Sequence, residues 1–263
     1  MNALTEIVTD TRRELARRRE RRSLKEVVAG GEERLARYGA PRSLRGALTA
    51  GHEISLIAEH KRRSPSAGMI RADRPLEQVI TAYEHGGAAA VSVLTESSHF
   101  GGTLADVEAA RRVTRLPILR KDFTVDPYQV HEALAAGADA VLLIVAALDD
   151  AMLAELLELA GTLGLDALVE VHGRTECSRA AGAGARLIGI NNRDLTTLQV
   201  DTGRTYELLP DVPHGSVVVA ESGLRDRAQL QELQLAGVHG VLIGEALMRA
   251  ADIEASCRAL TLA

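Results

Sequence analysis

The sequence predicts an α/β protein: a (β/α)8 TIM barrel preceded by an N-terminal helical extension. Eight short segments rich in Val, Ile and Leu recur after residue 50. They are apolar almost throughout, which is typical of parallel strands buried on both faces. Segments with amphipathic helical spacing lie between them, and Gly-Ala or Gly-Val pairs, typical of helix ends, precede several strands. Eight strand–helix units in a chain of 263 residues match one barrel.

A doubly wound open sheet also alternates strands with helices. Its dinucleotide-binding version places Gly-x-Gly-x-x-Gly after the first strand, and no such motif follows the first apolar segment here. The barrel is therefore favoured. We expect residues 1–50 to form a helical extension packed on the barrel, and residues 51–263 to form the barrel as a single catalytic domain.

The extension begins with a predicted helix at residues 4–28 that carries several runs of arginine. Such a basic stretch suggests a nucleic-acid contact, but acidic residues interleave the arginines and allow i,i+4 ion pairs on a solvated face. The net charge of −5 also lacks the basic footprint of a nucleic-acid protein. We therefore expect no nucleic-acid partner, and an extension of this length can also lie across one barrel end.

The barrel elements follow in order along the chain. We expect strands at residues 54–58, 89–94, 116–119, 139–145, 167–171, 186–190, 216–220 and 238–243. We expect helices at residues 75–85, 103–113, 127–136, 149–161, 173–182 and 226–236, and a short helix that begins at Gly244.

Polar residues follow most of the predicted strands, where a barrel of this class carries its functional side chains. Glu59 and Lys61 are two residues apart, so they point to the same side of the first strand. Each such residue by itself is more often a solvated rim residue. Together they place opposite charges in a partly dry cleft, where shifted pKa values permit acid and base chemistry near neutral pH. The other strand-end residues are Thr95 and Glu96, Lys121 and Asp122, Glu170 and His172, Asn191 and Arg193, Glu221 and Ser222, and Gly244 and Glu245.

Two glycine-bearing turns, at residues 220–224 and 242–247, follow the last two strands. Glycine lets a backbone approach a ligand closely, and free backbone N–H groups at such turns suit a phosphate. The loops after strands seven and eight are the frequent phosphate site of this barrel. We therefore expect the ligand to be a phosphorylated small molecule.

Several other classes of function are disfavoured. The eight histidines show no HxH or HExxH spacing, Cys177 and Cys257 lack CxxC partners, and no GxSxG motif is present. We expect no metal, and we expect two buried free thiols. No apolar run of about 18 residues and no apolar signal-peptide core occurs, so we expect a cytoplasmic protein without membrane contact.

Seven ordered motifs resemble those of the indole-3-glycerol phosphate synthase family. They are AEHKRRSPSAG, VSVLTE…FGG, PILRKDF, LVEVH, IGINNRDL, VAESG and LIGEALM, and they span residues 58–248. The resemblance implies a ring-closing decarboxylation and dehydration of 1-(2-carboxyphenylamino)-1-deoxyribulose 5-phosphate in tryptophan biosynthesis. The implied products are indole-3-glycerol phosphate, carbon dioxide and water, and no cofactor is needed.

The resemblance also implies roles for individual residues. Lys121 matches the general acid and Glu170 the principal acid/base, while Lys61 matches a lysine that pairs with substrate anions, supported by Glu59. The implied substrate-binding residues are Asn191, Arg193, Glu221, Ser64 and Phe123. The implied phosphate-binding residues are Ser222, Gly223, Gly244 and Glu245.

Two departures from the family pattern, Glu96 and Thr103, lie in the loop after the second strand and leave the proton-transfer residues intact. Two alternatives remain open. One is a related barrel that acts on another phosphosugar, for example an isomerase. The other is a non-catalytic binding protein, which the full charged set disfavours. The sequence does not fix the oligomeric state, and we expect a monomer or weak oligomer.

Overall fold

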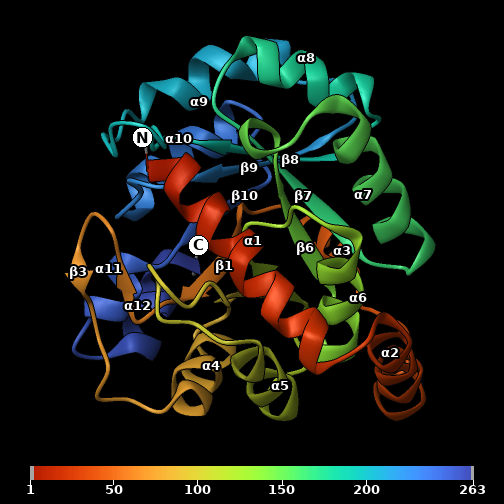
Figure 1. The fold of residues 1–263 in the computed structure, drawn as a ribbon. Helices are drawn as coiled ribbons and strands as arrows, with labels where there is room; N and C mark the ends of the chain where they lie inside the picture. The colour runs from red at the N-terminus through yellow and green to blue at the C-terminus, as the bar shows by residue number, and fades with distance from the viewer. Residues whose placement is uncertain (1–2, 262–263) are drawn as a thin grey trace.

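The computed structural model describes residues 3–261, and within them eight parallel strands close into a barrel (Figure 1). The strand order is β1-β10-β9-β8-β7-β6-β5-β4, and β4 pairs with β1 to close the ring. The predicted barrel is confirmed. Residues 1–2 of the predicted extension and residues 262–263 of the predicted barrel region lie outside the described residues. The barrel strands are β1 Ser55–His60, β4 Ala90–Leu94, β5 Ile118–Lys121, β6 Ala140–Ile144, β7 Asp166–Val171, β8 Leu187–Asn191, β9 Val217–Glu221 and β10 Gly240–Ile243.

Helices surround the barrel, and a small antiparallel hairpin follows its first strand. The hairpin consists of β2 Arg63–Ser64 and β3 Gly68–Met69. The sequence did not predict the hairpin, α9 or α12. The helices after β1 are α4 Leu76–His85, α5 Leu104–Val113, α6 Pro127–Ala136, α7 Asp150–Thr162, α8 Arg174–Gly182, α9 Gly203–Leu208, α10 Arg227–Leu235, α11 Glu245–Arg249 and α12 Ile253–Thr261, with short 3-10 turns η1 Val145–Ala147 and η2 Leu209–Asp211.

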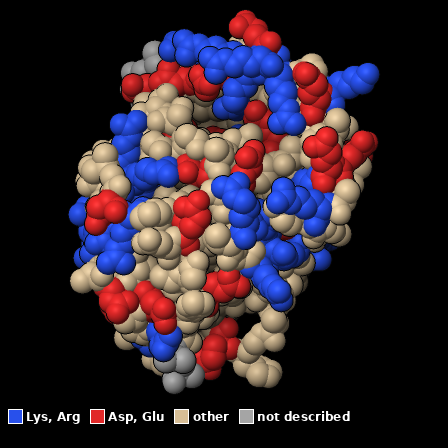
Figure 2. All heavy atoms as spheres, turned by 90° about the horizontal axis from the view of Figure 1, so that it is seen from below, with Lys and Arg blue, Asp and Glu red and all other residues tan. Residues whose placement is uncertain are grey.

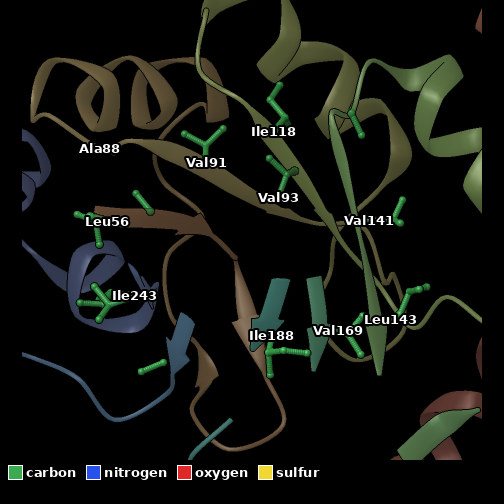
Figure 3. Packing of buried hydrophobic residues seen from close by; sticks show 14 of the residues in the cluster. Leu56, Ala88, Val91, Val93, Ile118, Val141, Leu143, Val169, Ile188 and Ile243 are labelled. Atoms are coloured by element: carbon green, nitrogen blue, oxygen red, sulfur yellow. The ribbon is translucent and has the colours of Figure 1, made fainter. Parts of the chain in front are cut away.

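Alternate residues of each strand face two different apolar layers. One set points outward and packs against the helices in the larger core cluster. The other set points inward and fills the barrel interior; in β1, for example, Leu56 belongs to the outer set and Ile57 to the inner set. Figure 3 shows outward side chains from several strands, including Leu56, Val91, Val93, Ile118, Val141, Leu143, Val169, Ile188 and Ile243.

Four strands extend one or two residues beyond their predicted C-terminal ends. The predictions stopped where the apolar run stopped, whereas backbone pairing continues through polar residues. Lys121 still pairs with Leu94, and Asn191 still pairs with Glu221. Lys121 and Asn191 therefore continue the alternation of their strands and point into the barrel, and their backbone is held by the sheet and not by a loop.

The extension forms three helices, α1 Ala3–Arg21, α2 Leu24–Tyr38 and α3 Leu44–Leu48. The single predicted helix at 4–28 is therefore wrong. A capping box explains the break: the Ser23 hydroxyl accepts the Glu26 N–H at 3.3 Å, and the Glu26 carboxylate accepts the Ser23 N–H at 2.7 Å. This motif starts a new helix at Leu24 because it satisfies backbone groups that are free at a helix start.

The extension contacts both ends of the barrel. In Figure 1, α1 (red) runs across the front of the barrel strands. Ile7 of α1 belongs to the same apolar cluster as Phe123 and Ile144, which lie at the carboxyl end of the strands. Leu48 of α3 accepts a hydrogen bond from Ser55, the first residue of β1, so α3 covers the amino end.

The arginine runs of α1 are engaged by carboxylates. Arg18 lies 3.0 Å from Glu132 of α6, and Arg19 lies 2.8 Å from Asp126, which caps that helix. Figure 2 shows acidic and basic side chains interspersed over one face of the molecule. Both cysteines are free and buried, as predicted. None of the helices in residues 3–261 is long and apolar enough to cross a membrane.

Candidate active site

The predicted site residues meet at the carboxyl end of the barrel in a cavity of about 800 Å³. Ser64 lines a smaller adjoining pocket of about 70 Å³, which Lys61, Phe123 and Arg193 also line. The other predicted residues that line the cavity are Glu59, Lys61, Lys121, Phe123, Glu170, Asn191, Arg193, Glu221, Ser222, Gly223, Gly244 and Glu245. This cavity thus collects residues from all eight barrel strands and from loops that follow them.

Lys121 ends β5 with its ammonium group between two carboxylates. Its Nζ lies 3.0 Å from Oε2 of Glu170 and 3.2 Å from Oε2 of Glu221, and 14% of the side chain is exposed. Burial by itself lowers the pKa of Lys121, but Glu170, Glu221 and Glu59 together raise it above its usual value. Lys121 therefore carries a positive charge between two carboxylates in a partly dry cleft.

Lys61 and Glu59 form a second ion pair on the inner wall. Lys61 Nζ lies 2.6 Å from Oε2 of Glu59, because residues two apart on a strand share one side. Arg62 points the other way and makes a bidentate pair with Asp106 of α5, at 2.7 and 2.8 Å. The strand alternation thus separates a site lysine from a structural arginine one residue later.

The two glutamates that share Lys121 have opposite environments. Burial alone would raise the pKa of Glu170, but Lys121, His172 and the amide of Asn191 (3.0 Å) bring it well below its usual range. Glu221 has fewer compensating partners, so burial and the neighbouring carboxylates raise its pKa to about 7. Two carboxyl groups with different protonation around one lysine are typical of acid and base pairs.

Glycine makes room for two of these carboxylates. A Cβ at Gly189, an inward position of β8, would overlap Oε1 of Glu221, and a Cβ at Gly244 would overlap Oε2 of Glu59. Ser222 adopts a left-handed φ of 67°, which non-glycine residues rarely take and which occurs preferentially at functional sites. A side chain at Gly189 or Gly244 would therefore displace one of these carboxylates.

Apolar residues complete the site, and sequence reasoning missed most of them. Leu142 and Ile144 of β6 line the cavity, and the alternation of β6 could have identified them. Leu4 and Ile7 of α1 line the smaller pocket, and no local signal places the extension there. Across residues 3–261, no group of three or more His, Cys, Asp or Glu side chains is arranged to hold a metal ion.

A closed (β/α)8 barrel with a lysine between two buried glutamates at its carboxyl end defines a barrel enzyme equipped for proton transfer. A family model described as indole-3-glycerol phosphate synthase matches residues 4–260. A Parafrankia protein named indole-3-glycerol phosphate synthase is 49% identical over 252 residues, 96% of this chain and 92% of its own length. One from Micrococcus luteus is 48% identical over 270 residues, 100% of this chain and 98% of its own. The chain belongs to the indole-3-glycerol phosphate synthase family.

Solved structures with lower identity share the fold. A 3-hexulose-6-phosphate synthase superimposes with a TM-score of 0.64 at 16% identity, over 79% of this chain and 98% of the other. A thiamine phosphate pyrophosphorylase from Pyrococcus furiosus gives a TM-score of 0.61 at 20% identity, over 83% and 96%. At these identities the likeness concerns the barrel alone.

Proposed function

We propose that this protein converts 1-(2-carboxyphenylamino)-1-deoxyribulose 5-phosphate to indole-3-glycerol phosphate, carbon dioxide and water, the indole-forming step of tryptophan biosynthesis. The observation that carries the proposal is the contact of the Lys121 ammonium with Glu170 and Glu221 in one cavity. Family membership over residues 4–260 supports it. The reaction needs acid and base groups but no change of oxidation state, so side chains suffice.

The substrate carries an anion at each end, and the site offers a place for both. We assign the phosphate to the backbone of Ser222, Gly223, Gly244 and Glu245, where small residues let a ligand come close. The Glu245 carboxylate is turned to Arg249 at 3.0 Å, which leaves its backbone N–H for the ligand.

We assign the carboxyphenyl group to the smaller pocket. Phe123 supplies an apolar wall there, and Ser64 supplies a hydroxyl. Lys61 and Arg193 border both hollows and bring two positive charges to the aromatic carboxylate.

Ring closure requires a proton at the ribulose carbonyl oxygen. As the ring carbon that bears the carboxylate attacks the C2 carbonyl, negative charge develops on that oxygen. Lys121 donates the proton, and Glu170 and Glu221 keep the lysine protonated and oriented beforehand. Loss of carbon dioxide then returns the electron pair to the ring and restores its aromaticity.

Dehydration completes the indole. The former carbonyl oxygen is now a hydroxyl group, and it leaves as water when it takes up a proton, which we assign to the Lys61 ammonium group in the same cavity. A proton leaves the neighbouring carbon as the new double bond forms. We assign that proton to Glu170, the ionised carboxylate of the site. Asn191 holds Glu170 and, with Glu221, binds the ribulose hydroxyls; Oε1 of Glu221 is a buried acceptor without a hydrogen-bond partner in residues 3–261.

The remaining parts of the proposal concern organisation. Residues 51–263 act as the catalytic domain, and residues 1–50 close one side of its mouth through Leu4 and Ile7. We propose that the protein works in the cytoplasm as a monomer or weak oligomer, without cofactor and without a nucleic-acid partner.

The direct test is turnover by the purified protein in the presence of a chelator. Addition of the ribulose phosphate substrate should yield a product with indole absorbance and fluorescence, together with one equivalent of carbon dioxide. A folded protein that forms no such product would sink the proposal. Turnover of a phosphosugar that lacks the carboxyphenyl group would instead favour the isomerase alternative.

A further inference from the structure

His172 is a mostly buried residue next to the site, and no step above uses it. It directly follows β7, two residues after Glu170, and 11% of its side chain is exposed. Its Nε2 lies 3.2 Å from Oε1 of Glu170, and its Nδ1 lies 3.2 Å from Oε2 of Glu176 in the first turn of α8. The ring thus bridges a carboxylate inside the cavity and a carboxylate outside it.

Both ring nitrogens lie 3.2 Å from carboxylate oxygens, and this arrangement favours a charged ring. A neutral imidazole has one N–H donor and one lone pair, which a carboxylate oxygen repels, whereas both nitrogens of an imidazolium attract carboxylates. Burial lowers the pKa of His172, but Glu170 and Glu176 outweigh it and raise the pKa to about 9. Glu176 is itself anchored, because its Oε2 also accepts the backbone N–H of His172 at 2.8 Å.

The imidazolium acts on one oxygen of Glu170. Oε1 faces His172 and the Asn191 amide, which leaves Oε2 for Lys121 at 3.0 Å. The other charged group that faces this carboxylate is Glu221, across Lys121. His172 and Lys121 therefore both lower the pKa of Glu170, against the effects of burial and of the negative charge of Glu221. His172 contacts one oxygen of the Glu170 carboxylate and Lys121 contacts the other.

We propose that His172 is a positioning residue for the ring-closing reaction. As an imidazolium held between Glu176 and Glu170, it fixes the orientation of Glu170 and keeps that carboxylate ionised, ready to accept the proton lost in dehydration. The inference rests on the proposed function for its catalytic consequence, but the charge and pairing of the ring do not depend on it. No proton leaves His172 during the reaction.

Kinetics of His172→Ala and His172→Gln test the consequence. We expect His172→Ala to lower kcat by about 10- to 100-fold, the usual cost of removing the group that orients a functional side chain, with KM changed by less than about threefold. The acidic limb of the kcat–pH profile should move to higher pH, because Glu170 loses a cation that favours its ionised form. His172→Gln keeps a donor without the charge, so it should recover part of kcat while the shifted limb remains.

Glu176→Gln provides a second route that leaves the ring in place. It should shift the acidic limb in the same direction by a smaller amount, and the double variant should be no worse than His172→Ala because both act through one contact chain. His85→Ala is the matched control: His85 is exposed, ends α4 and lies 3.7 Å from Glu254, and neither residue lines the cavity. It should leave kcat and the profile unchanged.

Nitrogen-15 NMR of the imidazole ring tests the pairing without substrate. In the unliganded wild-type protein, the ring of His172 should carry two protons at pH 7.5 and lose one near pH 9. In Glu176→Gln it should lose that proton at lower pH. A ring that is neutral at pH 7.5 would overturn the proposal whether or not the protein turns over substrate. An active, folded His172→Ala protein with the wild-type kcat–pH profile would also overturn it, and it would leave the proposed function standing.

Discussion

Substitution of Gly189 by alanine tests whether the inner wall of the barrel sets the position of Glu221. The added Cβ would overlap Oε1 of Glu221 and approach Cδ1 of Leu168 at 3.3 Å. Carbon and oxygen atoms pack at about 3.5 Å, so the carboxylate oxygen must retreat by about 1 Å or more. The contact between Oε2 of Glu221 and Nζ of Lys121, now 3.2 Å, then exceeds hydrogen-bond range.

The expected cost follows from that displacement. A misplacement of about 1 Å in a catalytic group lowers rates by up to about 100-fold, so we expect kcat of Gly189→Ala to fall by about 10- to 100-fold. Overpacking should cost about 1–3 kcal/mol, partly offset by about 0.5–1 kcal/mol from the lower chain entropy of alanine in the unfolded state. The net loss is at most about 2.5 kcal/mol, so we expect Tm to fall by up to about 10 °C.

Steady-state kinetics and thermal denaturation measure both effects. Gly161→Ala is the matched control, because nothing lies within 4 Å of a Cβ there and the residue is helical. It should keep full activity and gain about 0.5–1 kcal/mol of stability. The shorter side chain of Glu221→Asp should withdraw the carboxylate, so adding Gly189→Ala to that variant should have less effect than adding it to the wild type. A Gly189→Ala protein with wild-type kcat and Tm would refute the reasoning.

Three further predictions follow from the same geometry. Glu170→Gln should lower kcat by about 100- to 10,000-fold in steady-state assays, because the amide cannot accept the proton lost in dehydration; a fall of less than tenfold would assign the base elsewhere. Arg193→Ala should raise KM for the carboxylate-bearing substrate by about 10- to 100-fold, and it should change the inhibition constant of an analogue without that carboxylate by less than about twofold. An equal loss of affinity for both compounds would show that Arg193 does not bind the carboxylate. The wild type should lose stability relative to Glu221→Gln as pH rises from 4.5 to about 7, because the fold impedes the ionisation of Glu221 and the unfolded chain does not. Denaturant titration at both pH values measures the difference in the free energy of unfolding between the two proteins. A difference that stays constant would contradict the raised pKa of Glu221.

The sequence predicted the fold, and it predicted the location of much of the candidate site, because side chains alternate between the two faces of a strand. Ile57 faces inward, so Glu59 and Lys61, two and four residues later, must also face inward. The same reasoning applies to Lys121 two residues after Leu119, and to Glu170 two residues after Leu168. These positions follow from local periodicity alone.

The contacts that depend on tertiary structure could not be predicted. Placement of Ile7 beside Phe123 depends on how α1 crosses the barrel, which no local pattern encodes. The break before Leu24 did have a sequence signal, the pair Ser23 and Glu26, but the continuous run of helix-favouring residues masked it.

The contacts of His172 illustrate the same limit at the site. Its presence beside Glu170 was visible in the sequence, whereas its second partner, Glu176, becomes apparent only when α8 turns back over the end of β7. The charge of the His172 ring depends on Glu170 and Glu176 together, and the strand pattern predicts only the contact with Glu170. The different environments of Glu170 and Glu221 likewise arise from neighbours on other strands.

The central claim is that Lys121 protonates the carbonyl during ring closure, and the rate of product formation by Lys121→Ala tests it most directly. The variant should remain folded, because the Lys121 side chain lines the cavity and does not pack in the apolar core. We expect its kcat to fall by about 100- to 10,000-fold, the usual contribution of a general acid, under conditions where the wild type turns over the ribulose phosphate substrate. A folded Lys121→Ala protein that forms indole-3-glycerol phosphate at a rate close to that of the wild type would contradict the account.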